Sequence, residues 1–257
     1  MRSNAFFFFC ALLILWMGVA LCEEEAPSAS APEAQATRKV VYLTFDDGPC
    51  RSTIELLELL EEEGVPATFF LIGNELRNHP EAVRAIYEAG HAIGCHSFYH
   101  QKSVLLTTEG FRRETERFDR VLAEVLGRPL EVNLFRFPFG SSNTTSEVRR
   151  HAAESGYLWI DWNASNYDTH KEYNHSTEAM LAAAIRSSRD RDVVVLLMHE
   201  NRGRTREMLP MLLQHYRSEG YEFDVLSVEK IDQYIPNVNM GSPILLKDKL
   251  KDESAES

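Results

Sequence analysis

Residues 40–49 read VVYLTFDDGP, an apolar run that ends in two carboxylates and a Gly-Pro pair. The run Val40–Phe45 consists of aliphatic, aromatic and β-branched residues, which favours a strand buried on both faces. On a regular strand Asp46 and Asp47 would point to opposite sides. The Gly48-Pro49 pair allows the chain to turn, so one carboxylate can bind a metal ion while the other acts as a base. The alternative is a turn in which both acids only cap the loop.

Similar apolar runs recur along the chain and alternate with helical patterns. Further strands are expected at Ala67–Ile72, His91–Cys95, Leu134–Phe137, Leu158–Trp162, Val193–Met198 and Phe223–Leu226. Helices are expected at Thr53–Glu63, Glu81–Ala89, Glu109–Leu126, Ser146–Ser155, Thr177–Ser188 and Thr205–Ser218, and a glycine that can cap the C-terminal end follows five of them. This alternation predicts a parallel sheet. Seven strands in this order favour an α/β barrel with the helices outside, and a doubly wound open sheet is the alternative.

Ionisable residues stand at or just after the ends of five of these strands. In chain order they are Asp46 and Asp47, His96 and His100, Arg136, Asp168, and His199. Buried strands tolerate such groups poorly, whereas the carboxyl ends of parallel strands form the rim on which active sites are built. The sequence therefore predicts a single site at this rim.

The segment His96-Ser97-Phe98-Tyr99-His100 carries two imidazoles four residues apart. If the segment forms one helical turn, both rings project from the same face and reach one metal ion. The alternative is a pair of structural or surface histidines. Asp47 supplies a third, anionic ligand, and this set leaves positions open for water and substrate, as catalytic zinc sites do. Cobalt, iron and manganese also suit these ligands.

Charge and the N-terminal residues indicate partners and location. The 257 residues carry a formal net charge of −12, so no surplus of Lys and Arg is present to bind phosphates, and nucleic acid is not an expected partner. In residues 1–22, Arg2 precedes the uncharged run Ala5–Leu21. This pattern predicts a cleaved signal peptide or an N-terminal anchor that tethers the chain to a membrane through residues 5–22. Lipidation at Cys22 is a further alternative.

Residues 23–37 (EEEAPSASAPEAQAT) are rich in Glu, Ala, Pro and Ser and predict a disordered linker. One folded domain is then expected at 38–236, followed by a polar tail at 237–257. Cys50 and Cys95 stand beside two of the strand ends that carry the site. They can form a disulfide if the chain is exported, because exported proteins meet an oxidising environment. The alternative is two free cysteines, which are common in protein interiors.

Four motifs taken together resemble those of the polysaccharide deacetylase family, which is built on the NodB-homology domain. They are TFDDGP at 44–49, HSxxH at 96–100, RFPFG at 136–140 and LMH at 197–199. Segments 135–143, 161–163 and 196–199 are most similar to peptidoglycan N-acetylglucosamine deacetylases of Gram-positive bacteria. The resemblance implies a distorted (β/α)7 barrel of the NodB type and metal-dependent removal of N-acetyl groups from the N-acetylglucosamine units of a cell-wall polysaccharide, with peptidoglycan the expected polymer.

The resemblance also implies a role for each residue of the metal and base motifs. Asp47, His96 and His100 would hold one divalent metal ion, zinc being the first expectation. Ser97 would brace the loop between the two histidines. Asp46 would take a proton from the attacking water.

For the remaining motifs the resemblance implies residues that orient the catalytic groups, donate a proton or line the site. Arg136 would orient Asp46. His199 would protonate the leaving amine, with Asp168 as its acidic partner. The backbone N–H of Phe139 would help to stabilise the oxyanion, and Leu197 would line the acetyl pocket.

The sequence departs from the family at two places. The fourth motif usually reads Asp-x-x-Asp-Trp, whereas residues 165–169 read SNYDT, and Phe139 stands where close relatives often have Gly or Tyr. The family motif therefore does not identify the residues that form the wall of the sugar subsite. The alternative functions are a chitooligosaccharide deacetylase, an esterase acting on O-acetyl xylan, and a catalytically silent sugar-binding module. The expected protein is monomeric and is secreted or held at the outer face of the membrane.

Overall fold

A curled sheet forms the centre of the computed structural model, in which residues 38–231, 235 and 238–241 are described. Its strands are β1 Val40–Gly48, β2 Thr68–Leu71, β3 Ala92–Cys95, β4 Leu134–Phe135, β5 Leu158–Ile160, β6 Ala164–Ser165, β7 Val193–His199, β8 Glu222–Asp224 and β9 Met240–Gly241. Their order is β6-β7-β1-β2-β3-β4-β5-β9, and β8 pairs with the start of β1. All pairings are parallel except that of β9 with β5. The predicted parallel sheet is confirmed.

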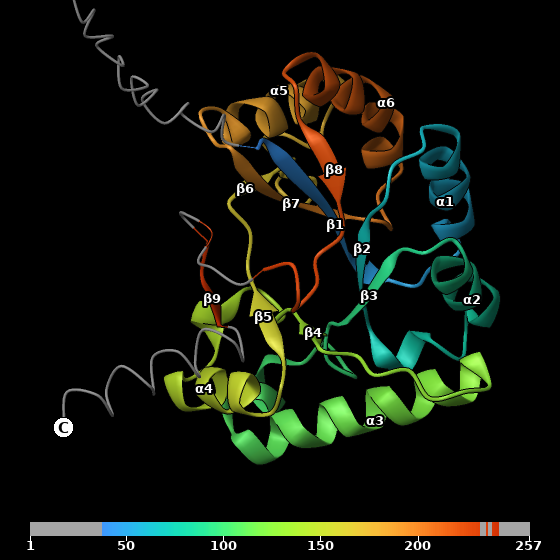
Figure 1. Ribbon diagram of the computed structural model, residues 1–257, viewed down its shortest axis with the longest axis vertical. Helices are drawn as coiled ribbons and strands as arrows, with labels where there is room; N and C mark the ends of the chain where they lie inside the picture. Colours follow the sequence, from blue (N-terminus) through green and yellow to red (C-terminus); the bar gives the residue numbers. More distant parts are fainter. Residues whose placement is uncertain (1–37, 232–234, 236–237, 242–257) are drawn as a thin grey trace, which may run out of the picture. The chain divides into compact units, whose positions relative to one another are not determined.

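Six α-helices surround this sheet within the described residues (Figure 1). They are α1 Thr53–Glu62, α2 Pro80–Glu88, α3 Thr108–Leu126, α4 Ser146–Glu154, α5 Thr177–Ser188 and α6 Gly203–Ser218. Short 3-10 helices stand at η1 Gly73–Glu75, η2 Lys102–Leu106 and η3 Ser141–Asn143. The glycines expected after five of the α-helices all have a left-handed backbone, as a C-terminal cap requires. The strands and the outer helices form an incompletely closed barrel, which confirms the distorted α/β barrel and not the doubly wound sheet.

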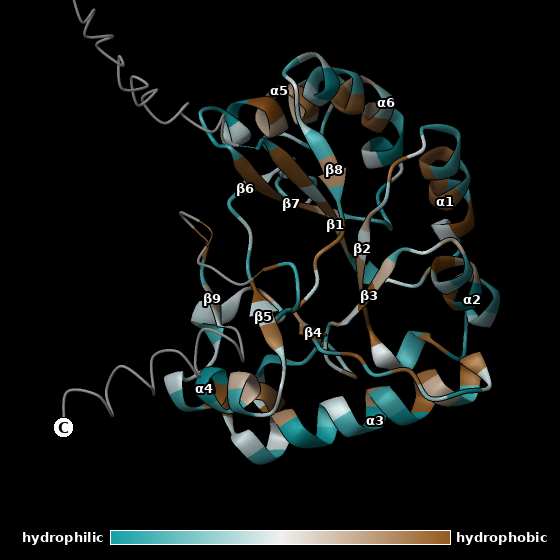
Figure 2. Ribbon diagram, in the orientation of Figure 1, coloured by the Kyte–Doolittle hydropathy of each residue, from teal (hydrophilic) through white to brown (hydrophobic). Residues whose placement is uncertain are grey.

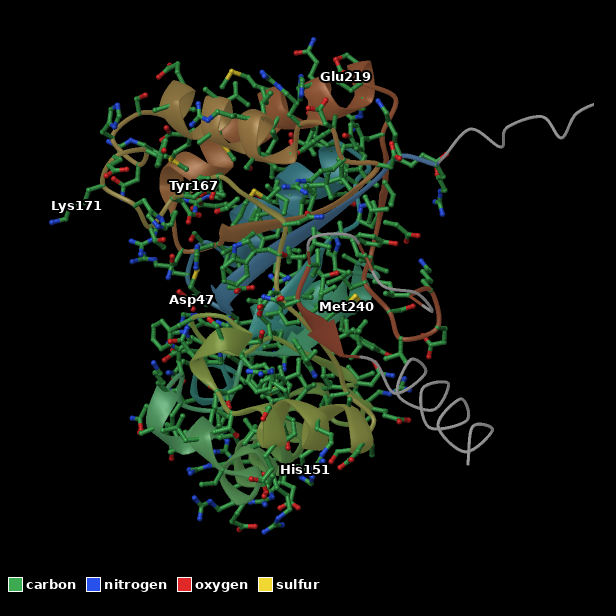
Figure 3. All side chains as sticks on the ribbon, turned by 90° about the vertical axis from the view of Figure 1, so that its left-hand side faces the viewer. Asp47, His151, Tyr167, Lys171, Glu219 and Met240 are labelled. Atoms are coloured by element: carbon green, nitrogen blue, oxygen red, sulfur yellow. The ribbon has the colours of Figure 1, made fainter. Side chains whose placement is uncertain are left out.

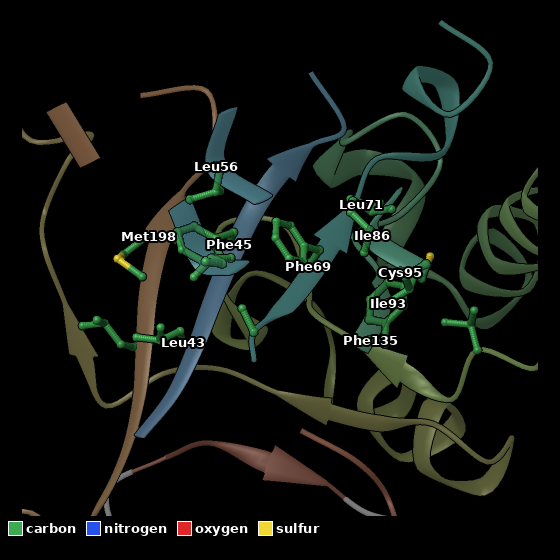
Figure 4. Packing of buried hydrophobic residues seen from close by; sticks show 14 of the residues in the cluster. Leu43, Phe45, Leu56, Phe69, Leu71, Ile86, Ile93, Cys95, Phe135 and Met198 are labelled. Carbon is green, nitrogen blue, oxygen red and sulfur yellow. The ribbon is translucent and has the colours of Figure 1, made fainter. Parts of the chain in front are cut away.

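Strands β1, β2 and β7 are buried along almost their whole length, and each face of the sheet has its own apolar cluster. Phe45, Phe69 and Met198 belong to the cluster between sheet and helices, and Figure 4 shows it from close by. Tyr42 and Phe70 belong to the second cluster, on the other face of the same strands. Along the strands the hydropathic colouring is brown over most of β1 and β7 (Figure 2). Each fully buried large apolar side chain contributes about 1.5–3 kcal/mol, so these short strands are fixed by packing on two sides.

The folded part of the chain extends further than the sequence predicts. The sequence predicts a polar tail from 237, but Met240–Gly241 forms β9 and pairs antiparallel with Trp159 and Ile160 of β5. Val238 and Met240 are buried, and these two apolar residues provide the physical reason, since they cover β5. Residues 242–257 and the segments predicted at 1–22 and 23–37 lie outside the described residues.

Two further expectations concern cysteines and membranes. Cys50 and Cys95 are both free thiols, the first half-buried and the second buried, so the structure does not contain the disulfide that the sequence left open. No helix among the described residues is long and apolar enough to cross a membrane.

Candidate active site

At the end of β1, two adjacent carboxylates approach the same histidine. Asp46 is still in register with Phe70 of β2, but Gly48 and not Asp47 pairs with the next residue of β2. Asp47 is thus the extra residue of a bulge, and its φ of 70° is left-handed. A bulge redirects side chains that would otherwise alternate between faces. As a result, the Nε2 atom of His96 lies 3.7 Å from a carboxylate oxygen of Asp46 and 3.7 Å from one of Asp47.

The candidate metal ligands Asp47, His96 and His100 come together although their local structure differs from the prediction. One ligand atom from each lies within 4.8 Å of the others, and the Nε2 atom of His100 is 3.4 Å from Oδ1 of Asp47. The expected helical turn at 96–100 is wrong, because the segment is a non-helical loop with φ of 65° at Ser97 and 54° at His100. The rings converge because this loop bends, so that their centroids are 4.9 Å apart.

The chemistry of these three side chains fits a divalent cation. Oδ1 of Asp47 is buried and makes no hydrogen bond within the described part of the chain. The Nδ1 atom of His96 lies 2.8 Å from the carbonyl oxygen of Arg136, and since a carbonyl only accepts, Nδ1 carries the proton and Nε2 keeps a free lone pair. Burial lowers the pKa of His96, which keeps the ring neutral. A neutral imidazole fixed by its second nitrogen is the form that binds metals.

Arg136 lies inside the barrel with no exposed surface. Its Nη1 donates to Oδ1 of Asp46 at 3.0 Å and to the hydroxyl of Thr44 at 2.6 Å. Its Nε and Nη2 donate to the carbonyl oxygens of Ile160 and Asp161. The guanidinium therefore links β1 with β5 and the residue after it, and it holds Asp46 in one orientation through a charge-assisted hydrogen bond.

His199, at the end of β7, pairs with Asp168. The Nδ1 atom of His199 is 2.7 Å from Oδ1 of Asp168, and its backbone N–H donates to Oδ2 at 2.8 Å. Asp168 follows the two-residue strand β6, which no sequence pattern indicates, and not β5 as predicted. The hydroxyl of Thr205 also donates to Asp168, at 2.9 Å. Burial of the His199 ring acts to lower its pKa, but the hydrogen bond and charge of Asp168 outweigh burial, and the pKa is raised.

Ser97 and Phe139 contact His100, and Leu197 precedes His199 by two residues on β7. Ser97 accepts the backbone N–H of His100 on its hydroxyl at 2.9 Å. Phe139 is 59% exposed, and its ring centroid lies 4.8 Å from that of His100. Leu197 is buried on β7 opposite Thr44. A cleft of about 280 Å³ opens beside Asp47 and His100, and Figure 3 shows Asp47 on the same side of the molecule as Tyr167, the residue before Asp168.

Two acidic residues beside the site were missed by the sequence reasoning. Glu200 is fully buried, and its carboxylate fills the space that a side chain at Gly48 would need. Burial raises the pKa of Glu200 to about 8. Asp161 accepts the backbone N–H of Ser141 at 2.8 Å and its hydroxyl at 2.7 Å, so it anchors the loop after Phe139. In the sequence, the sign of each is only its place as a polar residue directly after a buried apolar run.

Comparison with known proteins gives one consistent result. The polysaccharide deacetylase profile matches residues 33–159. A peptidoglycan-N-acetylglucosamine deacetylase of Bacillus cereus is 32% identical over 197 residues, which cover 75% of this chain and 71% of the relative. A CE4 esterase of Streptococcus mutans superposes with a TM-score of 0.69 and 31% identity, covering 74% of this chain and 87% of that one. A polysaccharide deacetylase of Bacillus cereus superposes with a TM-score of 0.68 and 30% identity, covering 77% of this chain and 97% of that one.

The fold comparison confirms that the barrel is of the NodB type. The shared identity extends over most of both chains in sequence and in structure, so it is not limited to short motifs. The chain therefore belongs to the polysaccharide deacetylase family, a family of hydrolases in which dependence on a divalent metal ion is general.

Proposed function

We propose that the chain removes N-acetyl groups from the N-acetylglucosamine units of peptidoglycan, using one divalent metal ion held by Asp47, His96 and His100. The observation that carries this proposal is the convergence of these three ligand atoms within 4.8 Å of one another. Two further pairs, Asp46 with Arg136 and His199 with Asp168, lie at the same rim. The donor set suits zinc first, and cobalt, iron or manganese as alternatives. The name of the Bacillus cereus relative supports the choice of polymer.

The first half of the reaction is assigned to Asp46. The metal ion supplies Lewis acidity, which polarises the acetyl carbonyl and makes water more acidic. Asp46 takes the proton of the water that attacks the carbonyl carbon, and its bond to Arg136 keeps the carboxylate aimed at the site. The backbone N–H of Phe139 stabilises the negative charge on the carbonyl oxygen, and Leu197 lines the space for the methyl group.

The second half is assigned to His199. Its Nε2 faces the carboxylates, 3.9 Å from Oδ2 of Asp47, while Nδ1 is held by Asp168. The raised pKa of the ring favours the protonated form, which a general acid needs. His199 gives its proton to the leaving nitrogen as the carbon–nitrogen bond breaks, and acetate and a free amine result.

The location follows from the N-terminal residues and from the polymer. We propose export of the chain through residues 1–22, with a linker at 23–37 and the catalytic domain from 38, and monomeric action at the cell wall. The uncharged run after Arg2 supports this. Mass spectrometry of the N-terminus of the protein recovered from the medium and from membranes separates cleavage after residue 22 from a retained tether.

One assay tests the proposed activity. Acetate release from peptidoglycan, chitin oligomers and acetylated xylan is measured for the wild type and for Asp46→Asn, together with metal content. Release from peptidoglycan by the wild type alone supports the proposal. Faster release from chitin oligomers or from xylan assigns the chain to a chitooligosaccharide deacetylase or an O-acetyl esterase instead. No release from any polymer by a metal-loaded wild type contradicts an enzymatic role.

A further inference from the structure

The inward face of α3 contains a carboxylate that is almost completely buried among apolar side chains. Phe111, Phe118 and Leu122 lie on this face and are buried, and Glu114 between them is only 5% exposed. A buried carboxylate costs several kcal/mol unless it is fully hydrogen-bonded. An apolar residue at this position would complete the helix face, so the partners of Glu114 indicate why a carboxylate stands there.

The partners of Glu114 are two peptide groups of the loop that carries the candidate metal ligands. Its Oε2 accepts the backbone N–H of Phe98 at 2.8 Å and that of Tyr99 at 2.9 Å. Both peptides lie between His96 and His100. Because this loop is not helical, its N–H groups have no acceptor one turn earlier, and a buried N–H without a partner is costly.

The same loop is fixed from its other side by η1. The carbonyl oxygens of Ser97 and Phe98 accept the N–H groups of Gly73 and Asn74 at 3.0 and 2.9 Å. Arg117, one turn after Glu114 on α3, places its guanidinium 4.3 Å from the ring centre of Phe98. Helix α3 thus holds the peptides from one side while η1 holds them from the other.

We propose that Glu114 is a positioning residue for the metal site, which sets the orientation of the 98–99 peptides and thereby the place of His100 relative to Asp47. The inference rests on the ligand set proposed above. Hydrogen bonds from N–H groups to an ionised carboxylate are stronger than those to a neutral acceptor. Groups that hold metal ligands without touching the metal typically change metal affinity 10–100-fold when they are replaced.

The test compares Glu114→Gln and Glu114→Ala with Glu116→Gln, a matched control on the same helix. Glu116 is exposed and pairs with Arg112, so its replacement removes the same charge away from the loop. Zinc affinity is measured by competition with a chromophoric chelator, the visible absorption spectrum is recorded with cobalt, and Tm is measured without metal. We expect Glu114→Ala to bind zinc about 10–100-fold more weakly, Glu114→Gln to show a smaller loss in the same direction, and Glu116→Gln to match the wild type.

Each result decides the inference. Weaker zinc binding and an altered cobalt spectrum in Glu114→Gln, with a metal-free Tm close to that of the wild type, support it. Unchanged affinity and spectrum in Glu114→Gln overturn it, even if Glu114→Ala fails to fold, because Glu114 then serves stability alone. If the wild type itself binds no zinc or cobalt, the proposed ligand set fails and the inference fails with it. If the wild type binds metal but releases no acetate, only the proposed activity fails.

Discussion

Replacement of Asp46 by Asn separates the proposed base from the proposed metal ligands. The side chain keeps its shape but can no longer accept a proton from water. A positioned general base is worth roughly 10²–10⁴-fold in turnover, which is about 2.7–5.4 kcal/mol of activation free energy. Metal content should stay at the wild-type level, because Asp47, His96 and His100 are unchanged.

The same substitution should also lower stability by an amount set by Arg136. The guanidinium is fully buried and donates to Asp46 at 3.0 Å. An amide oxygen can keep this hydrogen bond but not its charge. Hydrogen bonds to charged groups contribute about 1.5–3 kcal/mol and ordinary ones about 0.5–1.5 kcal/mol, so the loss is about 1–1.5 kcal/mol. For a chain of this size 1 kcal/mol shifts Tm by about 2–4 °C, so Tm should fall by roughly 2–6 °C.

Three measurements on one preparation check this prediction: initial rates of acetate release, metal content by mass spectrometry, and Tm by calorimetry. Asp47→Asn is the matched control, because it removes an adjacent carboxylate that does not contact Arg136. Loss of metal in Asp46→Asn with retention in Asp47→Asn would show that the two roles are exchanged. Wild-type turnover in Asp46→Asn would refute the assignment of the base.

Three further outcomes are expected. His100→Ala should abolish tight metal binding because the ligand set is incomplete, and full metal occupancy by elemental analysis would show that the ligand is wrongly assigned. In Asp168→Asn the basic limb of the pH–turnover profile should move toward acid, because the carboxylate that raises the pKa of His199 is gone; a limb in its wild-type place contradicts the pairing. Glu200 has its pKa raised from 4.5 to about 8 in the folded chain, so folding binds a proton and the metal-free protein should lose stability as pH rises between these values. Glu200→Gln should remove this slope in urea titrations at several pH values, and a slope equal to that of the wild type refutes the reasoning.

The strongly patterned parts of the molecule could be predicted from the sequence. Helix α5 has the predicted bounds, and the seven expected strands are all present, because continuous apolar runs bounded by glycines carry a clear signal. The bulge at Asp47 agrees with the expected turn at Gly48-Pro49. Strands β6 and β9 have two residues each, which is too short for any period to be visible.

The parts that depend on distant contacts could not be predicted. The i, i+4 spacing of His96 and His100 suggests a helical turn, but a carboxylate on α3 and backbone N–H groups of η1 fix a loop instead. Glu114 is 16 residues from Phe98 along the chain, and nothing near either residue in sequence reports the pairing. Glu200 was missed for the same reason, since its burial depends on the absence of a side chain at Gly48.

The left-handed backbone around the site has a consequence for the evolution and engineering of this chain. Among described residues other than glycine, six have positive φ, and five of these, Asp47, Ser97, His100, Phe139 and Tyr167, are in or next to the loops that form the site. Side chains in this conformation cost about 1–3 kcal/mol each and persist because the surrounding packing enforces them. The active site is thus a store of conformational strain that the rest of the barrel must outweigh. Selection for heat resistance alone would favour glycine or relaxed loops at these positions. Stability would then rise, and the positions of the side chains at the rim would be fixed less precisely.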